Sequence, residues 1–172
     1  AEGLSSGPHV TPPFVIEPGS AYGQGDKKGT YGGFSDVSHV EVALDFSLRK
    51  WRLLEAILGK DGEAPMDIIA MEEVDRFYGF FAPLMRLFGY EGLFVPKVRS
   101  PSVHLGWYSD GCALFWKTDK FELISEDRHE YKVGNQVMLM DLLKHHPTGQ
   151  HMLVNNTHLK AQKSVTSKKI RC

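Results

Sequence analysis

Residues 67–75 read Asp-Ile-Ile-Ala-Met-Glu-Glu-Val-Asp, a short apolar run that changes abruptly to carboxylates. The apolar part, 68–71, is too short for a helix of its own and predicts a strand buried on both faces. Three of the next four residues are acidic: Glu72, Glu73 and Asp75. A buried strand that ends in carboxylates places them at the edge of a sheet, where ligand-binding crevices form.

These carboxylates leave two interpretations open. Hard oxygen ligands of this kind suit Mg²⁺ or Mn²⁺. Neighbouring like charges also repel each other unless a cation or a basic group compensates them. The same residues are also typical of a helix start, where an N-cap and acids in the first turn interact favourably with the helix dipole. Spacing alone favours the helix start, because many helices begin with acidic residues.

Helical periodicity flanks the strand on both sides. The stretch 45–59 predicts a helix that Asp45 caps and Gly59 ends. The stretch 77–88 predicts a second helix with a wide apolar face, which Gly89 ends. The remaining pattern is mostly strands, expected at 93–95, 112–116, 121–124, 136–143 and 152–154. This order predicts a mixed α/β fold in which helices cover a sheet.

A second polar strand end lies at residues 155–159, Asn-Asn-Thr-His-Leu. A histidine at such an edge, here His158, is suited to bind or protonate a phosphate oxygen. It is also one of 8 histidines in the chain, and spacing alone favours an ordinary histidine at a strand end. Asp110 is expected to accept a hydrogen bond or to cap a turn, and Cys112 to be a buried, small apolar residue.

Composition narrows the class of protein. The chain has 172 residues, a hydrophobic fraction of 42% and a net charge of -1, which suit one folded domain and exclude a strongly basic nucleic-acid coat protein. We expect an irregular Gly- and Pro-rich segment at 1–36, a partial catalytic domain at 37–172 and a basic polar segment at 160–172. No apolar run approaches a membrane span, and two cysteines without a metal-binding spacing favour a reducing compartment, which we take to be the cytoplasm.

Several strings, taken together, resemble the endonuclease/exonuclease/phosphatase superfamily. Residues 67–75 resemble that family's D-I-…-Q-E-V strand. Residues 110–115, Asp-Gly-Cys-Ala-Leu-Phe, and 156–161, Asn-Thr-His-Leu-Lys-Ala, resemble its deadenylase branch, which includes nocturnin-like and Angel-like proteins. The resemblance covers about residues 31–172.

The resemblance implies a fold, a cofactor and roles for three residues. The family fold is a four-layer α/β sandwich, in which two packed mixed sheets lie between helices, and its members hydrolyse phosphoesters with Mg²⁺, for which Mn²⁺ is an alternative. Glu73 matches the metal-binding glutamate, and His158 matches the histidine that contacts the scissile phosphate. Asn156 lies in the same motif and is expected to help orient the catalytic site.

Two departures from the family pattern stand out. Glu72 stands where the family usually has Gln, which adds a carboxylate beside Glu73. The family's W-N-x-L-A motif, its later G-D-x-N motif and its terminal histidine have no counterpart in these 172 residues. We therefore expect the chain to be a fragment of a longer enzyme that is inactive and poorly folded when expressed alone.

Three functional hypotheses follow from the resemblance. The first is a metal-dependent 3′ exoribonuclease of the deadenylase type, whose partner is the poly(A) 3′ end of RNA. The second is a nocturnin-like phosphatase that removes the 2′-phosphate of the nucleotide NADP(H). The third, from another class, is a non-catalytic fragment or binding module; the presence of both Glu73 and His158 counts against it for the parent protein.

Overall fold

A computed structural model describes residues 45–59, 66–100, 103, 108–132 and 134–159 of the chain. The chain divides into two units, Ala1–Ala56 and Ile57–Cys172, each of which is described by itself. The predictions for the segments 1–36 and 160–172, and the domain boundary expected at residue 37, lie outside the described residues.

Helix α2 spans Phe46–Leu58 and has the predicted signals at both ends. At its start, the backbone N–H of Ser47 donates to Oδ1 of Asp45 at 2.8 Å, as expected of an N-cap. The hydrogen bonds from Ser47 hold the pKa of Asp45 below its ordinary value. At its end, Gly59 has a φ of 87°, a left-handed conformation that glycine adopts without steric cost.

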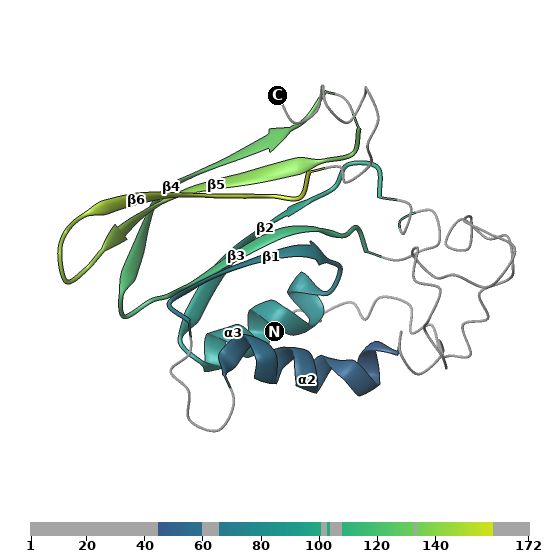
Figure 1. Cartoon of the computed structure of the whole chain (residues 1–172), viewed down its shortest axis with the longest axis horizontal. Helices are drawn as coiled ribbons and strands as arrows, with labels where there is room; N and C mark the ends of the chain where they lie inside the picture. Colours follow the sequence, from purple (N-terminus) through teal and green to yellow (C-terminus); the bar gives the residue numbers. More distant parts are fainter. Residues whose placement is uncertain (1–44, 60–65, 101–102, 104–107, 133, 160–172) are drawn as a thin grey trace, which may run out of the picture. The chain divides into compact units, whose positions relative to one another are not determined.

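The first sheet contains strands β1 (Ile68–Val74), β2 (Tyr90–Pro96) and β3 (Gly111–Lys117), in the antiparallel order β1-β3-β2 (Figure 1). The central strand β3 is buried from Gly111 to Trp116. In β1, by contrast, Ala70 is exposed, so the prediction that 68–71 is buried on both faces is wrong. The reason is position in the sheet. Strand β1 is an edge among the described strands, whereas β3 is the central strand and is buried on both faces.

The second sheet contains strands β4 (Phe121–Glu130), β5 (Val137–His145) and β6 (His151–Thr157), in the antiparallel order β4-β5-β6 (Figure 1). Strand β4 continues well past its predicted end at residue 124. Its polar second half stays extended because it pairs with β5 as far as Glu130, which lies opposite Val137. The alternation of buried and half-buried residues along β5 shows that one face of this sheet packs inward.

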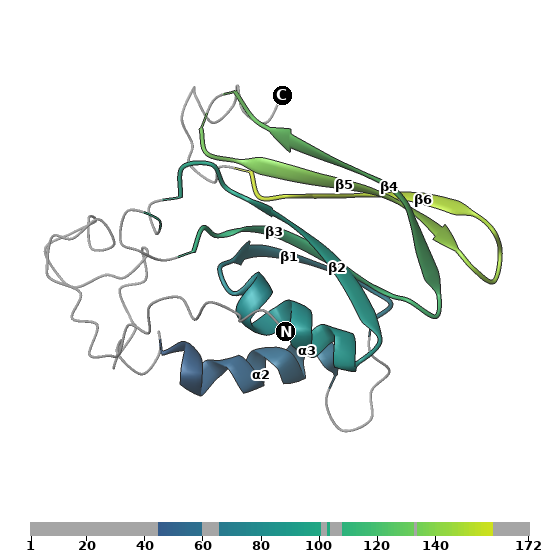
Figure 2. The same cartoon turned by 180° about the vertical axis from the view of Figure 1, so that it is seen from behind.

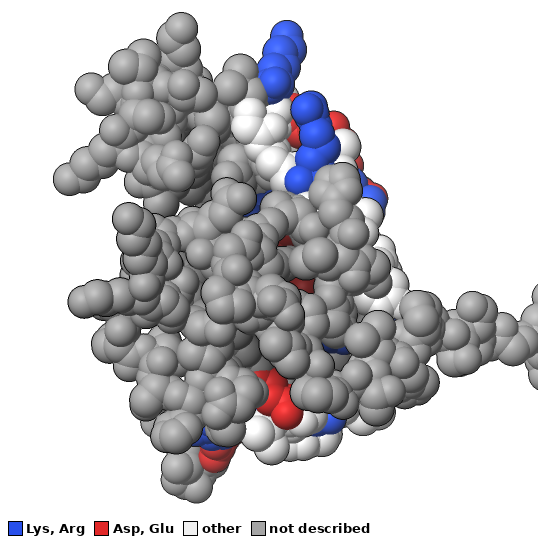
Figure 3. Space-filling view, turned by 90° about the vertical axis from the view of Figure 1, so that its right-hand side faces the viewer, with Lys and Arg blue, Asp and Glu red and all other residues white. Residues whose placement is uncertain are grey.

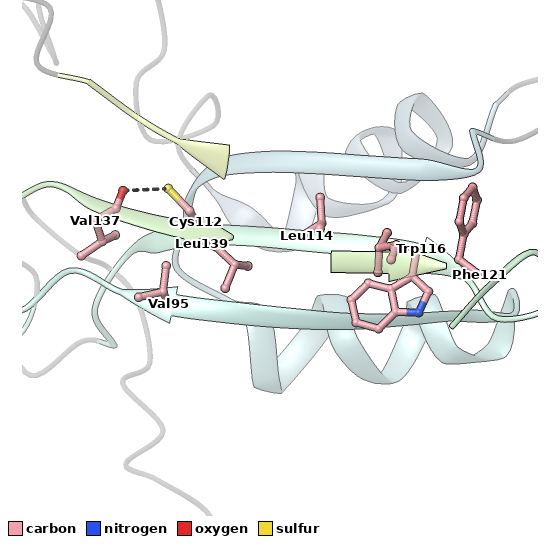
Figure 4. Packing of buried hydrophobic residues seen from close by; sticks show 8 residues of the cluster. Val95, Cys112, Leu114, Trp116, Phe121, Val137 and Leu139 are labelled. Carbon is pink, nitrogen blue, oxygen red and sulfur yellow. Dashed lines mark hydrogen bonds between the residues drawn. The ribbon is translucent and has the colours of Figure 1, made fainter. Parts of the chain in front are cut away.

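The core lies between the two sheets. Val95 and Trp116 from the first sheet pack with Val137 and Leu139 from the second (Figure 4). Cys112 is also buried here, as predicted, and its Sγ contacts the carbonyl oxygen of Val137 at 3.9 Å.

A helical layer covers the other face of the first sheet. It consists of a π-helical turn η1 (Phe77–Phe81) that continues into α3 (Ala82–Leu87), and it lies against the sheet from both viewing directions (Figures 1 and 2). Phe77 stacks on Phe94 of β2, with ring centroids 5.1 Å apart. The described part of Ile57–Cys172 therefore has a helix–sheet–sheet arrangement. None of the helices in the described residues is long and apolar enough to cross a membrane.

Candidate functional site

Strand β1 ends in a bulge that displaces Glu73. The pairing with β3 shifts register between Met71 and Val74, and Glu73 has a φ of 54°, the one positive φ of a non-glycine residue in the described ranges. A bulge of this kind redirects a side chain away from the strand's own alternation. The helix that follows has Arg76 at its N-cap position with no side-chain capping hydrogen bond. The structure therefore does not support the helix-cap interpretation of the carboxylates.

His158 follows strand β6 and lies beside Glu73. Its Nδ1 is 3.5 Å from Oε1 of Glu73, too far for a good hydrogen bond, and the facing side chains are 33% and 65% exposed. This Nδ1 atom is buried and has no hydrogen-bond partner in the described structure. Two polar strand ends that are 85 residues apart in sequence, one from each sheet, thus converge on one point.

Asn156 connects the two sheets directly behind this pair. Its side chain is buried, with 4% exposed. The Nδ2 group donates to the carbonyl oxygen of Met71 at 2.9 Å and to that of Ala113 at 2.8 Å. Since Met71 is the last residue before the register shift, this amide holds the backbone from which Glu73 projects.

The same end of the first sheet carries an ion pair that sequence reasoning missed. Nζ of Lys97 lies 2.5 Å from Oδ2 of Asp110, and Oγ of Ser100 donates to Oδ1 of the same carboxylate at 2.5 Å. Burial acts to raise the pKa of Asp110, but these hydrogen bonds hold it below its ordinary value. The sequence predicted a hydrogen-bonding role for Asp110, but its partner sits 13 residues away in a segment without periodicity.

The Cys112 thiol and the Glu72 carboxylate also lie at this end of the first sheet. Burial raises the pKa of the Cys112 thiol, and the nearby charge of Glu72 adds to the effect. Both positive and negative side chains are visible among the coloured residues of the face shown in Figure 3. The described residues contain no group of three or more His, Cys, Asp or Glu side chains arranged to hold a metal ion.

Comparison with known proteins shows which family this chain resembles. Mouse nocturnin is 35% identical over 126 residues, which are 70% of this chain and 28% of nocturnin. The CCR4-Not complex 3′-5′-exoribonuclease subunit Ccr4 of Debaryomyces hansenii is 33% identical over 141 residues, 68% of this chain and 16% of that protein. The human nocturnin catalytic domain, solved with a bound sulfate anion, superposes with a TM-score of 0.61 at 34% identity, covering 67% of this chain and 44% of that one.

The chain belongs to the endonuclease/exonuclease/phosphatase superfamily. This confirms the resemblance and the α/β fold class read from the sequence. No protein-family model matches the chain. The chain spans 28% or less of the length of the two curated relatives above, so the activity of the whole protein is a matter for proposal.

Proposed function

We propose that the intact protein is a metal-dependent phosphoester hydrolase that acts as a 3′ exoribonuclease on poly(A). The observation that carries the proposal is the approach of Glu73 and His158 from different sheets to 3.5 Å, at the edge where both strands end. The exoribonuclease named among the relatives supports RNA as the substrate class.

The residues present suit a magnesium ion that is bound largely by water and substrate. Mg²⁺ commonly takes one or two protein carboxylates and completes its shell with waters and phosphate oxygens. Glu73 offers one such carboxylate, exposed and displaced from the strand by the bulge, and would hold the ion. When bound, the ion polarises the phosphoryl group and neutralises the charge that develops on it.

His158 is suited to contact the phosphate with its other ring nitrogen. Because Nδ1 is buried and lies 3.5 Å from Oε1 of Glu73, Nε2 is the atom left to hydrogen-bond a phosphoryl oxygen. Such a contact stabilises the transition state most when the donor is already oriented before the reaction. In this proposal the Glu73 carboxylate, 3.5 Å from Nδ1, orients the imidazole by electrostatic attraction rather than through a hydrogen bond.

Asn156 acts in this proposal as a positioning residue. Both hydrogens of its amide are used by the carbonyls of Met71 and Ala113, so the Nδ2 group has no hydrogen left for a substrate. Its contribution to hydrolysis is to fix the β1 bulge relative to β6, and therefore the distance between Glu73 and His158.

Removal of the 2′-phosphate of NADP(H) is the alternative activity and would use the same Glu73 and His158. The two activities differ in what holds the base and ribose, and the exoribonuclease relative favours RNA. Assays of the intact protein on short poly(A) and on NADPH distinguish them.

The test of the proposed function is a matched pair of glutamate variants in the intact protein. Glu73→Gln removes the proposed ligand charge and is expected to lower hydrolysis of short poly(A) by about a hundredfold at limiting Mg²⁺. Glu72→Gln removes the same charge one residue earlier and is expected to keep most activity. Near-normal turnover of Glu73→Gln at limiting Mg²⁺ would show that the metal assignment is wrong.

A further inference from the structure

A cavity lies beside strand β2, which is an edge of the first sheet among the described strands, apart from the Glu73–His158 pair. Its volume is about 250 Å³. It is lined by η1, α3 and β2, and Arg128 reaches it from β4. We call this cavity the β2 groove. None of its lining residues has a role in the proposed hydrolysis.

Tyr78 gives the groove an exposed aromatic surface. Its side chain is 72% exposed, although it lies next to a buried aromatic cluster. Phe77 and Phe94 hold the ring edge-on, with centroids 5.0 and 6.0 Å away at interplanar angles of 90° and 87°. A ring fixed in this way presents a face on which a planar group can stack without first being ordered.

Two arginines give the groove its charge. The guanidinium of Arg128 lies 3.0 Å from the carboxylate of Glu126, which partly neutralises it. Arg86 projects from α3 and makes no ion pair with another described residue. The groove therefore has a surplus of positive charge next to an aromatic face, which matches a phosphate attached to a planar base.

The groove lies within reach of the catalytic end. Pro96 of β2 and Val74 of β1 both pair with Gly111 of β3, so these residues form one row across the sheet. Phe94 and Gly92, which line the groove, lie two and four residues before Pro96. With a rise of about 3.3 Å per residue and a strand spacing of about 4.8 Å, the groove begins roughly 12–16 Å from the Val74 end of that row. An extended RNA strand of a few nucleotides spans this distance.

We propose that the β2 groove holds a nucleotide of the single-stranded RNA substrate, upstream of the bond that is cut. The base stacks on Tyr78, and the phosphate pairs with Arg86 and Arg128. This inference rests on the proposed exoribonuclease function and adds to it a site that selects long substrates. A peptide strand added to the edge of β2 is the competing occupant. The exposed ring of Tyr78 and the two arginines of the lining favour a nucleotide over it.

The first test measures RNA affinity in an inactive background. Tyr78→Ala and Arg86→Ala are made in the intact protein that carries Glu73→Gln, and the anisotropy of a labelled oligoadenylate of about ten nucleotides reports binding. We expect each variant to weaken binding about tenfold. For Tyr78→Ala this is the lower to middle range for loss of one base stack, and for Arg86→Ala it corresponds to loss of one charge-assisted phosphate contact. Tyr78→Phe keeps the ring and is expected to retain the affinity. Leu87→Ala, an exposed residue of α3 outside the groove, is the matched control.

The second test uses substrate length in the active enzyme. An adenosine dinucleotide cannot reach the groove, so Tyr78→Ala should leave its cleavage rate unchanged while slowing the longer oligoadenylate several-fold. Equal slowing of both substrates, or unchanged affinity for the longer RNA in both groove variants, would overturn the inference, and unchanged affinity would leave the β2 edge to a peptide partner. If the intact wild-type protein neither binds nor cleaves oligoadenylate, the proposed function itself fails.

Discussion

The two sheets of the described structure differ in how they are covered. In the first sheet, β3 is buried from Gly111 to Trp116, because η1 and α3 cover one face and the second sheet covers the other. In the second sheet, β5 alternates between buried and half-buried residues, and Leu153 on β6 is 61% exposed. No element within the described ranges covers that outer face, where a four-layer sandwich has its last layer of helices.

The two sheets therefore contribute to the proposed site in different ways. The doubly covered sheet provides a rigid frame for the bulge that carries Glu73. The second sheet contributes His158 and Asn156, and it is fixed to the frame by its inner face and by the amide of Asn156. The proposed site depends on both sheets. Substitutions that loosen one sheet, or the link between the two, should therefore differ in how much they lower the free energy of unfolding and the rate of hydrolysis.

The largest expected effect comes from crowding the first sheet. A Cβ added at Gly111 would lie 2.0 Å from the carbonyl oxygen of Val95 and 2.8 Å from Cα of Pro96, both backbone atoms. Gly111→Ala should therefore lower the free energy of unfolding by about 3 kcal/mol or more. The control is Gly149→Ala in the turn of the second sheet. There an added Cβ would meet no atom within 4 Å, and the only cost is the strain of an alanine at a φ of 68°. We expect this variant to lose about 1 kcal/mol of unfolding free energy. Urea unfolding of both variants checks the ranking, and equal losses would contradict it.

Breaking the link between the sheets should cost less stability and more activity. Asn156→Ala removes one buried and one partly buried hydrogen bond and should cost about 2–3 kcal/mol. It should also slow hydrolysis, because the bulge that carries Glu73 loses its support. The matched control is Asn155→Ala, at an exposed neighbour on the same strand, which should change neither property. If Asn156→Ala unfolds more easily but hydrolyses at the normal rate under folding conditions, its positioning role is disproved.

The buried carboxylate of Asp141 makes the second sheet sensitive to pH. Its side chain is 0% exposed on the inner face of β5, and neither oxygen has a hydrogen-bond partner in the described structure. Burial, together with the charge of Glu126, raises its pKa from 3.8 to about 6, although Arg128 acts in the opposite direction. The folded state thus binds this proton more tightly than the unfolded state, and stability is lost as the pH rises from about 4 to about 6.

Asp141→Asn removes this titration. Relative to the wild type, the variant should gain about 2 kcal/mol of stability between pH 4 and pH 7. The difference between the two pH values is the measurement, since the constant cost of an unpaired amide cancels in it. A stability difference that does not change with pH would show that the carboxylate does not titrate in this range.

The sequence predicted what depends on neighbouring residues. Helix α2, its cap at Asp45 and its end at Gly59 follow from local spacing, and all three are confirmed. The two strand ends that carry Glu73 and His158 were also evident, because each changes from apolar to polar within a few residues. The roles of Glu73, His158 and Asn156 remain predictions.

What the sequence did not predict depends on contacts between distant residues. The bulge that redirects Glu73 arises from its pairing with β3, and the bonds of Asn156 reach 85 and 43 residues back along the chain. The Lys97–Asp110 ion pair forms only because β2 and β3 are neighbours. The second half of β4 lacks a strand-like composition and is ordered by β5. In each case tertiary pairing, not local preference, determines the outcome.

The most direct test of the account is the effect of His158→Ala on the single-turnover rate of the intact protein, measured together with its affinity for Mg²⁺. A lost transition-state hydrogen bond should slow cleavage of short poly(A) by about a hundred- to a thousandfold. The affinity for Mg²⁺ should change little, because the proposed ligand is Glu73. An unchanged single-turnover rate would contradict the claim that the two sheets meet to form a catalytic site.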